Sequence, residues 1–585
     1  MSVKNASLVR AIRFEELQKA GRMALQLEGQ SIVLFAYKDQ VYALDNRCPH
    51  MGFPLDRGSL KEGILTCHWH HARFDLESGG TFDQWADDVR AFPVEIRDGE
   101  VWVDLAGRAD LYRHNRERLR AGLERDLPLV IGKAVLVLLE VDGDPVEPFR
   151  TGLEFGARYR RGGWGQGLTM LTCLMNILTF LDAADRPRAL YHGLSAVSEN
   201  SAGSPPRFLV HPLPGEPPRL PTLKRWFRRF VEVRDAEGAE RCLASAIRAG
   251  AGDREMADML FTAATDHRYI QIGHVADFTN KAFEALDIAG WDFAELILTS
   301  LVPAYAGATR MEESNSWRNP VDLVEILETA FERLPAALQS GQEKDSDSQP
   351  AWKFQDELIQ VLLGEDPQAI VDALLQALRD GARAAGLASA VSYAAALRIA
   401  RFHTSNEFSD WDTCLHTFTF ANAIEQAVRR APSVELMRGV FDAAMSIYLD
   451  RFLNIPAARL PQVRTDVTEV EGSLKELAAL LDRQQQVNQA AGLVAGFLAA
   501  DGSPGRLLAT LGKLLLREDR DFHTIQALEA AFQQHLLQGD PQARTHVLVA
   551  ATRYLAAHSP TVRSQGQTYD IAYRLHRGER LYEED

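Results

Sequence analysis

Two short segments near the N-terminus each pair a cysteine with a histidine. Cys48 and His50 are separated by one residue, and Cys67 and His70 are separated by two. Thiolate sulfur and imidazole nitrogen both bind zinc and iron, so these four residues form a candidate metal site. One alternative is a structural zinc ion held by all four. The other is a [2Fe–2S] cluster with two thiolates on one iron and two imidazoles on the other.

The residues around the two pairs favour the cluster over zinc. Gly52-Phe53-Pro54-Leu55 follows the first pair, and Phe74-Asp75 and then Gly79-Gly80 follow the second. This pattern resembles the Rieske domains of ferredoxins and oxygenases, and the resemblance covers residues 6–105. It implies a [2Fe–2S] cluster as cofactor, with the ligands Cys48, His50, Cys67 and His70.

Hydrophobic periodicity divides the chain into two parts. Residues 8–105 alternate apolar and polar side chains in short runs, which indicates an antiparallel β-domain. After Gly107 the apolar residues recur at spacings of three and four, which indicates helices. The predicted fold class is therefore multidomain, with a small all-β Rieske domain over residues 1–106 and a large all-α domain over residues 107–585.

Bulk properties restrict the partners and the compartment. The formal net charge of −16 argues against nucleic acid and anionic membrane surfaces as partners. The apolar runs are too short to span a membrane, and the N-terminus has no apolar signal region. The five cysteines show no disulfide framework, so a cytoplasmic location is expected. A homo-oligomer is left open.

A Rieske cluster delivers electrons, so the large helical domain raises the question of what receives them. No Glu-x-x-His pair occurs in the helical region, which argues against a ferritin-like di-iron bundle. Several histidines from separate helices could instead hold one non-haem iron, with Lys281 as a further ligand if it carries a carbamate. Taken singly, each of the histidines is better explained as an ordinary hydrogen-bonded core or surface residue than as a metal ligand. The candidates for this second iron site are His192, His267, His274, His403, His416 and Lys281.

The helical region also resembles the questin oxidase-like proteins. The matching segments are His416-Thr417-x-x-x-Ala421-Asn422-Ala423 and His192-Gly193-Leu194. This resemblance implies a non-haem iron oxygenase that acts on an aromatic or polyketide-like substrate.

The leading hypothesis is an iron-dependent oxidoreductase, in the oxygenase class, whose Rieske cluster passes electrons to a histidine-ligated iron in the helical domain. Because no dinucleotide-binding glycine motif follows a strand, a separate reductase or ferredoxin is expected as electron donor. Dioxygen and a small molecule are the expected substrates. Two alternatives remain. One is an electron-transfer or redox-sensing protein whose helical domain binds a partner, and the other is an accessory subunit of an oxygenase.

Overall fold

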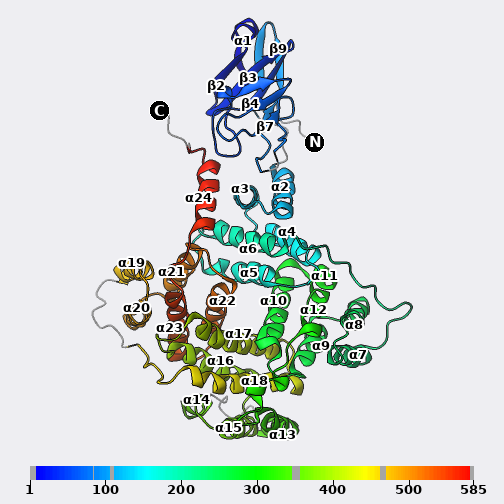
Figure 1. Cartoon of the computed structure of the whole chain (residues 1–585), viewed down its shortest axis with the longest axis vertical. Coiled ribbons are helices and arrows are strands. Elements are labelled where there is room, and N and C mark those ends of the chain that lie inside the picture. Colours follow the sequence, from blue (N-terminus) through cyan, green and yellow to red (C-terminus); the bar gives the residue numbers. More distant parts are fainter. Residues whose placement is uncertain are drawn as a thin grey trace. The chain divides into compact units, whose positions relative to one another are not determined.

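The computed structural model of the chain describes residues 8–83, 85–105, 111–344, 356–461 and 470–579, together with residue 581. All the described strands lie in the N-terminal region, coloured blue in Figure 1. Beyond Asp104, the described residues form the 23 α-helices α2 to α24 and several short 3₁₀ turns. The predicted fold class is confirmed. The predicted boundary between residues 106 and 107 lies outside the described residues.

The strands form three small antiparallel sheets, with the orders β1-β10-β9, β2-β3-β4-β8 and β5-β6-β7. One short helix, α1 (Phe14–Ala20), follows the first strand. The strands are β1 (Leu8–Arg13), β2 (Arg22–Leu27), β3 (Gln30–Tyr37), β4 (Gln40–Asp45), β5 (Ser59–Lys61), β6 (Ile64–Thr66), β7 (Arg73–Asp75), β8 (Ala91–Phe92), β9 (Val94–Arg97) and β10 (Glu100–Asp104).

Strand β3 joins two hydrophobic cores, because successive side chains of a strand point to opposite faces of the sheet. Ile32 and Leu34 belong to one core, which includes strands β1 and β10. Val33 and Phe35 belong to the other, which also contains Cys48 and Cys67. The two candidate cysteine ligands are therefore anchored in the second core by their own buried side chains.

The helical part is built around α17, which packs against α10, α16, α18 and α22. Buried residues occur all round α17, as expected of a central helix. The helices up to α12 are α2 (Leu111–Arg125), α3 (Pro128–Val141), α4 (Val146–Arg158), α5 (Gln166–Asn176), α6 (Arg186–Ser201), α7 (Leu220–Glu232), α8 (Ala236–Arg248), α9 (Asp253–Thr265), α10 (His274–Ala289), α11 (Ala294–Thr299) and α12 (Val302–Gly307). The later ones are α13 (Leu323–Lys344), α14 (Asp356–Leu362), α15 (Pro367–Arg379), α16 (Ala384–Ala400), α17 (Phe408–Arg430), α18 (Val434–Asp450), α19 (Val470–Leu481), α20 (Val487–Ala499), α21 (Pro504–Leu516), α22 (Phe522–Leu537), α23 (Pro541–Ala557) and α24 (Ser564–His576).

The chain divides into two compact units. The first contains residues 1–148 and 565–585, and the second contains residues 149–564. Helices α2 and α3 and nearly all of α24 therefore belong to the same unit as the strands. None of the described helices is long and apolar enough to cross a membrane.

Candidate metal centres

The first candidate centre lies on two loops of the β-region. Cys48 and His50 follow β4, whereas Cys67 and His70 lie between β6 and β7. Gly52 closes the first loop with a φ of +82°, a conformation that favours glycine, and its N–H donates to the carbonyl oxygen of Cys48 at 2.7 Å. The N–H of Cys67 donates to the carbonyl oxygen of Ala72 at 2.8 Å and closes the second loop.

The side chains of the two loops converge. The rings of His50 and His70 lie edge to face with their centroids 4.8 Å apart. The thiols of Cys48 and Cys67 are buried and form a hydrogen bond, which lowers the pKa of Cys67 to about 6 and raises that of Cys48. Burial lowers the pKa of His50 to about 4, so its ring is neutral at pH 7. Its buried Nδ1 atom has no hydrogen-bond partner among the described residues.

These observations fit a [2Fe–2S] cluster. Two adjacent thiols, two adjacent imidazoles and an unpartnered buried ring nitrogen are the donors that such a cluster needs. Backbone N–H groups of His50 and Met51 point at Cys48 Sγ, and those of Trp69 and His70 point at Cys67 Sγ. Such hydrogen bonds stabilise the negative charge of a thiolate ligand. They also raise the reduction potential of the cluster to which that thiolate is bound.

Comparison with known families identifies this region. Residues 7–93 match the Rieske [2Fe–2S] domain family. A [2Fe–2S] cluster is therefore implied as the cofactor of the first compact unit. This match confirms the predicted Rieske domain, but it identifies nothing in the helical part of the chain.

Relatives of the Rieske domain occur in several redox systems. The chain is 24% identical over 99 residues to the ferredoxin component of a naphthalene 1,2-dioxygenase system from Pseudomonas putida, covering 17% of this chain and 95% of that protein. It is 33% identical over 109 residues to the oxygenase subunit of 3-chlorobenzoate-3,4-dioxygenase from Comamonas testosteroni, covering 17% of this chain and 25% of that subunit.

Human apoptosis-inducing factor 3 is 29% identical over 96 residues, and the chain spans only 16% of its length. Among solved structures, the ferredoxin of carbazole 1,9a-dioxygenase from Nocardioides aromaticivorans is 28% identical, with a TM-score of 0.16 over 16% of this chain and 95% of that one. These likenesses are confined to about a sixth of the chain.

A buried lysine from α3 supports the first cluster loop. Lys133 Nζ donates to the carbonyl oxygen of Pro49, and it lies 3.4 Å from that of His50 and 3.6 Å from Asp87 Oδ2. Asp87 also forms an ion pair with Arg118 of α2. Burial lowers the pKa of Lys133 to about 8, so the amine is still protonated at pH 7. Two cations and one carboxylate thus leave a net positive charge beside the Cys48–His50 loop.

The second candidate centre is a group of three histidines within the second compact unit. His274 begins α10, His416 lies in the middle of α17, and His523 lies in the first turn of α22. One ring nitrogen of each lies within 4.8 Å of the other two. Among the described residues, no other group of three or more histidines, cysteines or carboxylates meets this criterion. We call this group the histidine triad.

The spacing within the triad suits a metal ion. His416 Nε2 and His523 Nε2 are 3.0 Å apart. Two nitrogens at right angles around an ion, each at about 2.1 Å, would be separated by roughly the same distance. Burial lowers the pKa of His274 to about 3 and that of His416 to about 4, so both rings keep a free lone pair at neutral pH.

Asp412 lies behind the triad, one helical turn before His416. Its Oδ2 atom is 3.9 Å from His523 Nδ1, on the opposite side of the ring from the Nε2 atom that faces His416. Despite burial, the nearby ring of His558, whose Nε2 atom is 3.6 Å from Asp412 Oδ1, and the hydrogen bond from the Tyr554 hydroxyl lower the pKa of Asp412, which is therefore ionised. A carboxylate beside the outer nitrogen of a histidine ligand orients the ring and raises its basicity.

A strained segment places His274 at the start of its helix. Gln271 and Ile272 have φ angles of +52° and +49°, and Gly273 has a φ of +90°. Positive φ is costly for a β-branched residue such as isoleucine, and it persists where the surroundings enforce it. Here two hydrogen bonds hold the segment: Gln271 N–H donates to Thr309 O at 2.7 Å, and Thr309 N–H donates to Gln271 Oε1 at 2.9 Å.

The other predicted iron ligands lie outside the triad. His267 Nδ1 contacts Glu312 Oε1 at 2.8 Å, and His403 forms a local hydrogen bond with Ser405. His192 is buried in α6. Lys281 Nζ lies 2.5 Å from Glu529 and 2.9 Å from Glu284.

The environment of Lys281 argues against a carbamate. Although burial works in the opposite direction, Glu284 and Glu529 raise the pKa of Lys281 well above its ordinary value. A protonated amine has no lone pair with which to attack carbon dioxide. Lys281 is thus placed as the cation of a buried ion-pair network.

His523 is the triad member that the sequence prediction missed. It lies 107 residues after His416, and no fixed spacing relates the two. The available local signal is its position in the segment Asp521-Phe522-His523-Thr524, where Asp521 caps α22 by accepting a hydrogen bond from the Thr524 N–H. That pattern predicts where the helix begins, and it does not predict a metal ligand.

Proposed function

We propose that the chain is an iron-dependent oxidoreductase of the oxygenase class, in which the Rieske cluster passes electrons to an iron ion held by His274, His416 and His523. The observation that carries the proposal is the convergence of three imidazole nitrogens from three helices. A ferrous ion with three imidazole ligands would supply one-electron chemistry and open coordination positions.

The residues of the chain have distinct parts in this proposal. The neutral rings of His274 and His416 provide lone pairs without first losing a proton. Asp412 orients His523 and balances the positive charge of the ion. The strained turn before His274 fixes the start of α10 and hence the position of the first ligand.

The choice of iron over zinc rests on the accompanying cluster. Three histidines with an open position also suit a hydrolytic zinc ion. A Rieske domain in the same chain supplies single electrons, however, and a zinc ion cannot accept them because it is not redox-active. A redox-active metal therefore makes use of both parts of the chain.

The substrate class follows by analogy. The relatives of the Rieske domain include components of systems named for naphthalene and 3-chlorobenzoate. Together with the likeness of the helical region to questin oxidase-like proteins, this supports an aromatic or polyketide-like substrate. A separate reductase or ferredoxin would supply the electrons.

Iron content tests the proposal. We expect the full-length protein, reconstituted without oxygen, to hold about three irons per chain, two in the cluster and one in the triad. His416→Ala and His523→Ala should each lower this to about two and leave the visible absorption of the cluster intact. His535→Ala, a change in the same helix as His523 but outside the triad, should retain three. Two irons in the wild-type protein would refute the proposal.

An electron-transfer protein is the second candidate. It is favoured by the fact that the chain covers 95% of the naphthalene dioxygenase ferredoxin, a protein that is itself an electron carrier by name. In that case the helical part would bind a partner, and the reduced protein would consume dioxygen no faster than its His416→Ala variant does.

A further inference from the structure

A row of polar side chains continues from the triad along two of its helices. Residues three or four apart share one side of a helix. At these spacings after His274 on α10 and His523 on α22 lie five polar residues, which we call the polar ladder: Asp277, Lys281, Glu284, Gln526 and Glu529. The two halves of the ladder meet, because Gln526 donates a hydrogen bond to Asp277 and Lys281 Nζ lies 2.5 Å from Glu529 Oε2.

The ladder contains more carboxyl groups than cations. Three carboxyl groups, those of Asp277, Glu284 and Glu529, accompany the single amine of Lys281. Burial raises the pKa of Asp277 to about 7 and also raises the pKa of Glu529, because ionising all three groups would leave unpaired negative charge in the interior. Cys173 of α5, which also faces Lys281 and Glu529, stays a neutral thiol because burial raises its pKa. At neutral pH the ladder therefore holds a proton that it can release.

The far end of the ladder reaches solvent. The side chain of Glu284 is 12% exposed, whereas Lys281 and Glu529 are fully buried. Lys281 Nζ contacts both carboxylates, at 2.9 Å for Glu284 and 2.5 Å for Glu529, and the amide of Asn176 also donates to both. At such distances the ammonium group can donate a proton to Glu529 as it accepts one from Glu284, and Lys281 remains a cation.

The near end of the ladder lies beside the triad. Asp277 is one helical turn after His274, and Gln526 is one turn after His523. Gln526 Oε1 is buried and has no hydrogen-bond partner among the described residues. A buried amide oxygen of this kind is usually paired with water. Burial raises the pKa of Asp277, and the charge of Lys281 opposes this effect, so the two groups also interact electrostatically.

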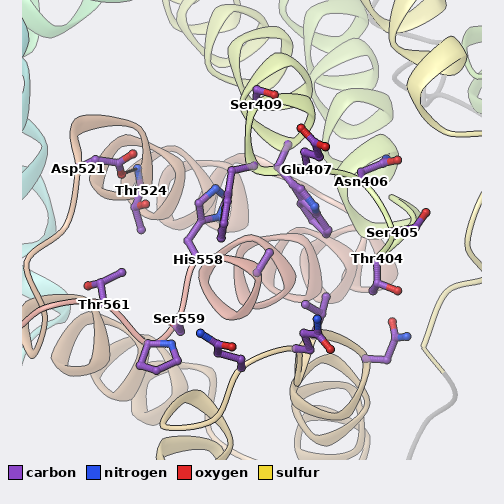
Figure 2. Close-up of a pocket in the computed structure, with 18 of the residues that line it drawn as sticks. Thr404, Ser405, Asn406, Glu407, Ser409, Asp521, Thr524, His558, Ser559 and Thr561 are labelled. Carbon is purple, nitrogen blue, oxygen red and sulfur yellow. Dashed lines mark hydrogen bonds between the residues drawn. The ribbon is translucent and has the colours of Figure 1, made fainter.

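A large cavity of the same compact unit offers no equivalent route. Its volume is about 1120 Å³, and Figure 2 shows Asp521, Thr524 and His558 among the residues around it. None of the three ligands of the triad lines it. The cavity is linked to the triad through His558 and Asp412. Asp412 is ionised, however, so it has no proton to give.

We propose that the polar ladder carries protons between the protein surface at Glu284 and the triad. The inference rests on the proposed function, because each electron passed to dioxygen is accompanied by one proton. When one oxygen atom enters a C–H bond and the other leaves as water, two electrons from the cluster and two protons are consumed. A proton enters at Glu284 and passes by way of Lys281 to Glu529. From there it moves past Gln526 to Asp277.

Reoxidation of the cluster tests the surface end of the ladder. Full-length, iron-loaded protein is reduced, freed of excess reductant and mixed with dioxygen, and the visible absorption of the cluster is followed. Glu284→Gln should slow the reoxidation by about tenfold or more, with about three irons per chain still bound. Its solvent isotope effect should exceed that of the wild type, because proton transfer then limits the rate. A purely structural loss would not change this isotope effect.

An exposed carboxylate on the same helix provides the control. Asp287→Asn, one turn beyond Glu284 on α10, should leave both the rate and the isotope effect unchanged. A wild-type rate in Glu284→Gln, or a slower rate with the isotope effect of the wild type, would overturn the proposal.

Proton release on metal binding tests the triad end without turnover. When cobalt(II) enters the triad of the full-length protein at pH 6, its positive charge should favour the ionised form of Asp277 and expel the proton to the buffer. Calorimetry in two buffers of different ionisation enthalpy gives the number of protons released per ion. Asp277→Asn should release fewer, by up to about one. Equal release from both proteins at equal stoichiometry would overturn the proposal.

Failure of the proposed function has a different signature. Cobalt that His416→Ala also binds lies outside the triad and is subtracted. A wild-type protein with no cobalt left after this subtraction, or one that reoxidises no faster than His416→Ala, refutes the proposed function. A protein that loads the triad but shows no effect of Glu284→Gln or Asp277→Asn refutes only the proton route.

Discussion

The two candidate metal centres are assembled in opposite ways. The four predicted ligands of the Rieske cluster lie between residues 48 and 70, on two loops joined by short strands. The three histidines of the triad lie between residues 274 and 523, on three helices that meet in the folded chain. A centre built from adjacent loops leaves a motif in the sequence, whereas a centre built from distant helices leaves only scattered histidines.

The surroundings of the two centres also differ in charge. Lys133 and Arg118 outnumber Asp87 beside the Cys48–His50 loop, so the cluster has a positive neighbourhood. The triad has the ionised carboxylate of Asp412 behind one of its rings. Positive charge favours a cluster that accepts electrons, and negative charge favours a site that retains a cation. The following four predictions test this contrast.

The largest expected effect is the loss of one centre without the other. Cys67→Ala removes a predicted cluster ligand, so the visible absorption of the cluster should disappear completely. The triad should still hold about one metal ion per chain, because its ligands lie in the other compact unit. Cys242→Ala, a buried cysteine in α8 outside both centres, is the control and should keep the cluster. Loss of both metals in Cys67→Ala would show that the centres are not independent.

The next effect concerns the carboxylate behind the triad. Asp412→Asn keeps an oxygen that can accept the hydrogen bond from Tyr554, but it removes the negative charge beside His523. Loss of such a neighbour typically weakens metal binding by about 10- to 100-fold. Competition with a coloured chelator would measure the affinity. Asp410→Asn, a change two residues away on the same helix, should leave the metal affinity at the wild-type value. An equal loss of affinity in both variants would argue against a specific role of Asp412.

Much of the fold was predictable from sequence because its signals are local. Alternation of apolar residues in strands such as β3, and helical spacing after Gly107, predicted a β-region followed by helices, as observed. The position of α2, α3 and α24 in the same unit as the strands was not predictable in this way. It depends on contacts between distant segments, such as Lys133 with Pro49, and periodicity carries no information about them.

The candidate sites were likewise predictable only where the signal in the sequence is local. The cluster ligands were predicted from spacing and neighbouring glycines. His274 and His416 were among the candidates for iron, but nothing local distinguished them from His192, His267 and His403. His523 was missed because its partners lie more than a hundred residues away in the sequence. Only the packing of α10, α17 and α22 brings the three rings together.

A smaller effect should appear in the reduction potential of the cluster. Lys133→Met removes a buried positive charge beside the Cys48–His50 loop, and the reduced cluster, which is more negative, loses more stabilisation than the oxidised one. The midpoint potential should therefore fall. Lys133→Arg keeps the charge and should lie closer to the wild type. A potential in Lys133→Met that equals or exceeds the wild-type value, measured by a spectroscopic redox titration, would contradict this electrostatic role.

The smallest effect concerns a buried carboxyl group one turn beyond His274. Burial raises the pKa of Asp277 to about 7, and Gln526 donates a hydrogen bond to it. An aspartate in the unfolded chain has a pKa of about 3.9, so between these values the folded protein holds a proton that the unfolded chain has lost. The stability that this proton contributes is full below about pH 4, and it declines as the pH rises to about 7, by at most about 1.4 kcal/mol per pH unit.

Asp277→Asn should remove this part of the pH dependence, which urea unfolding followed by circular dichroism at pH 5, 6, 7 and 8 would show. Asp292→Asn, an exposed position after the same helix, should keep the wild-type slope. A cation in the triad favours the ionised form of a carboxyl group one helical turn away, so metal loading should reduce the difference in slope between the wild type and Asp277→Asn. If the metal leaves this difference unchanged but binds with the expected stoichiometry, the ion is held somewhere other than beside His274.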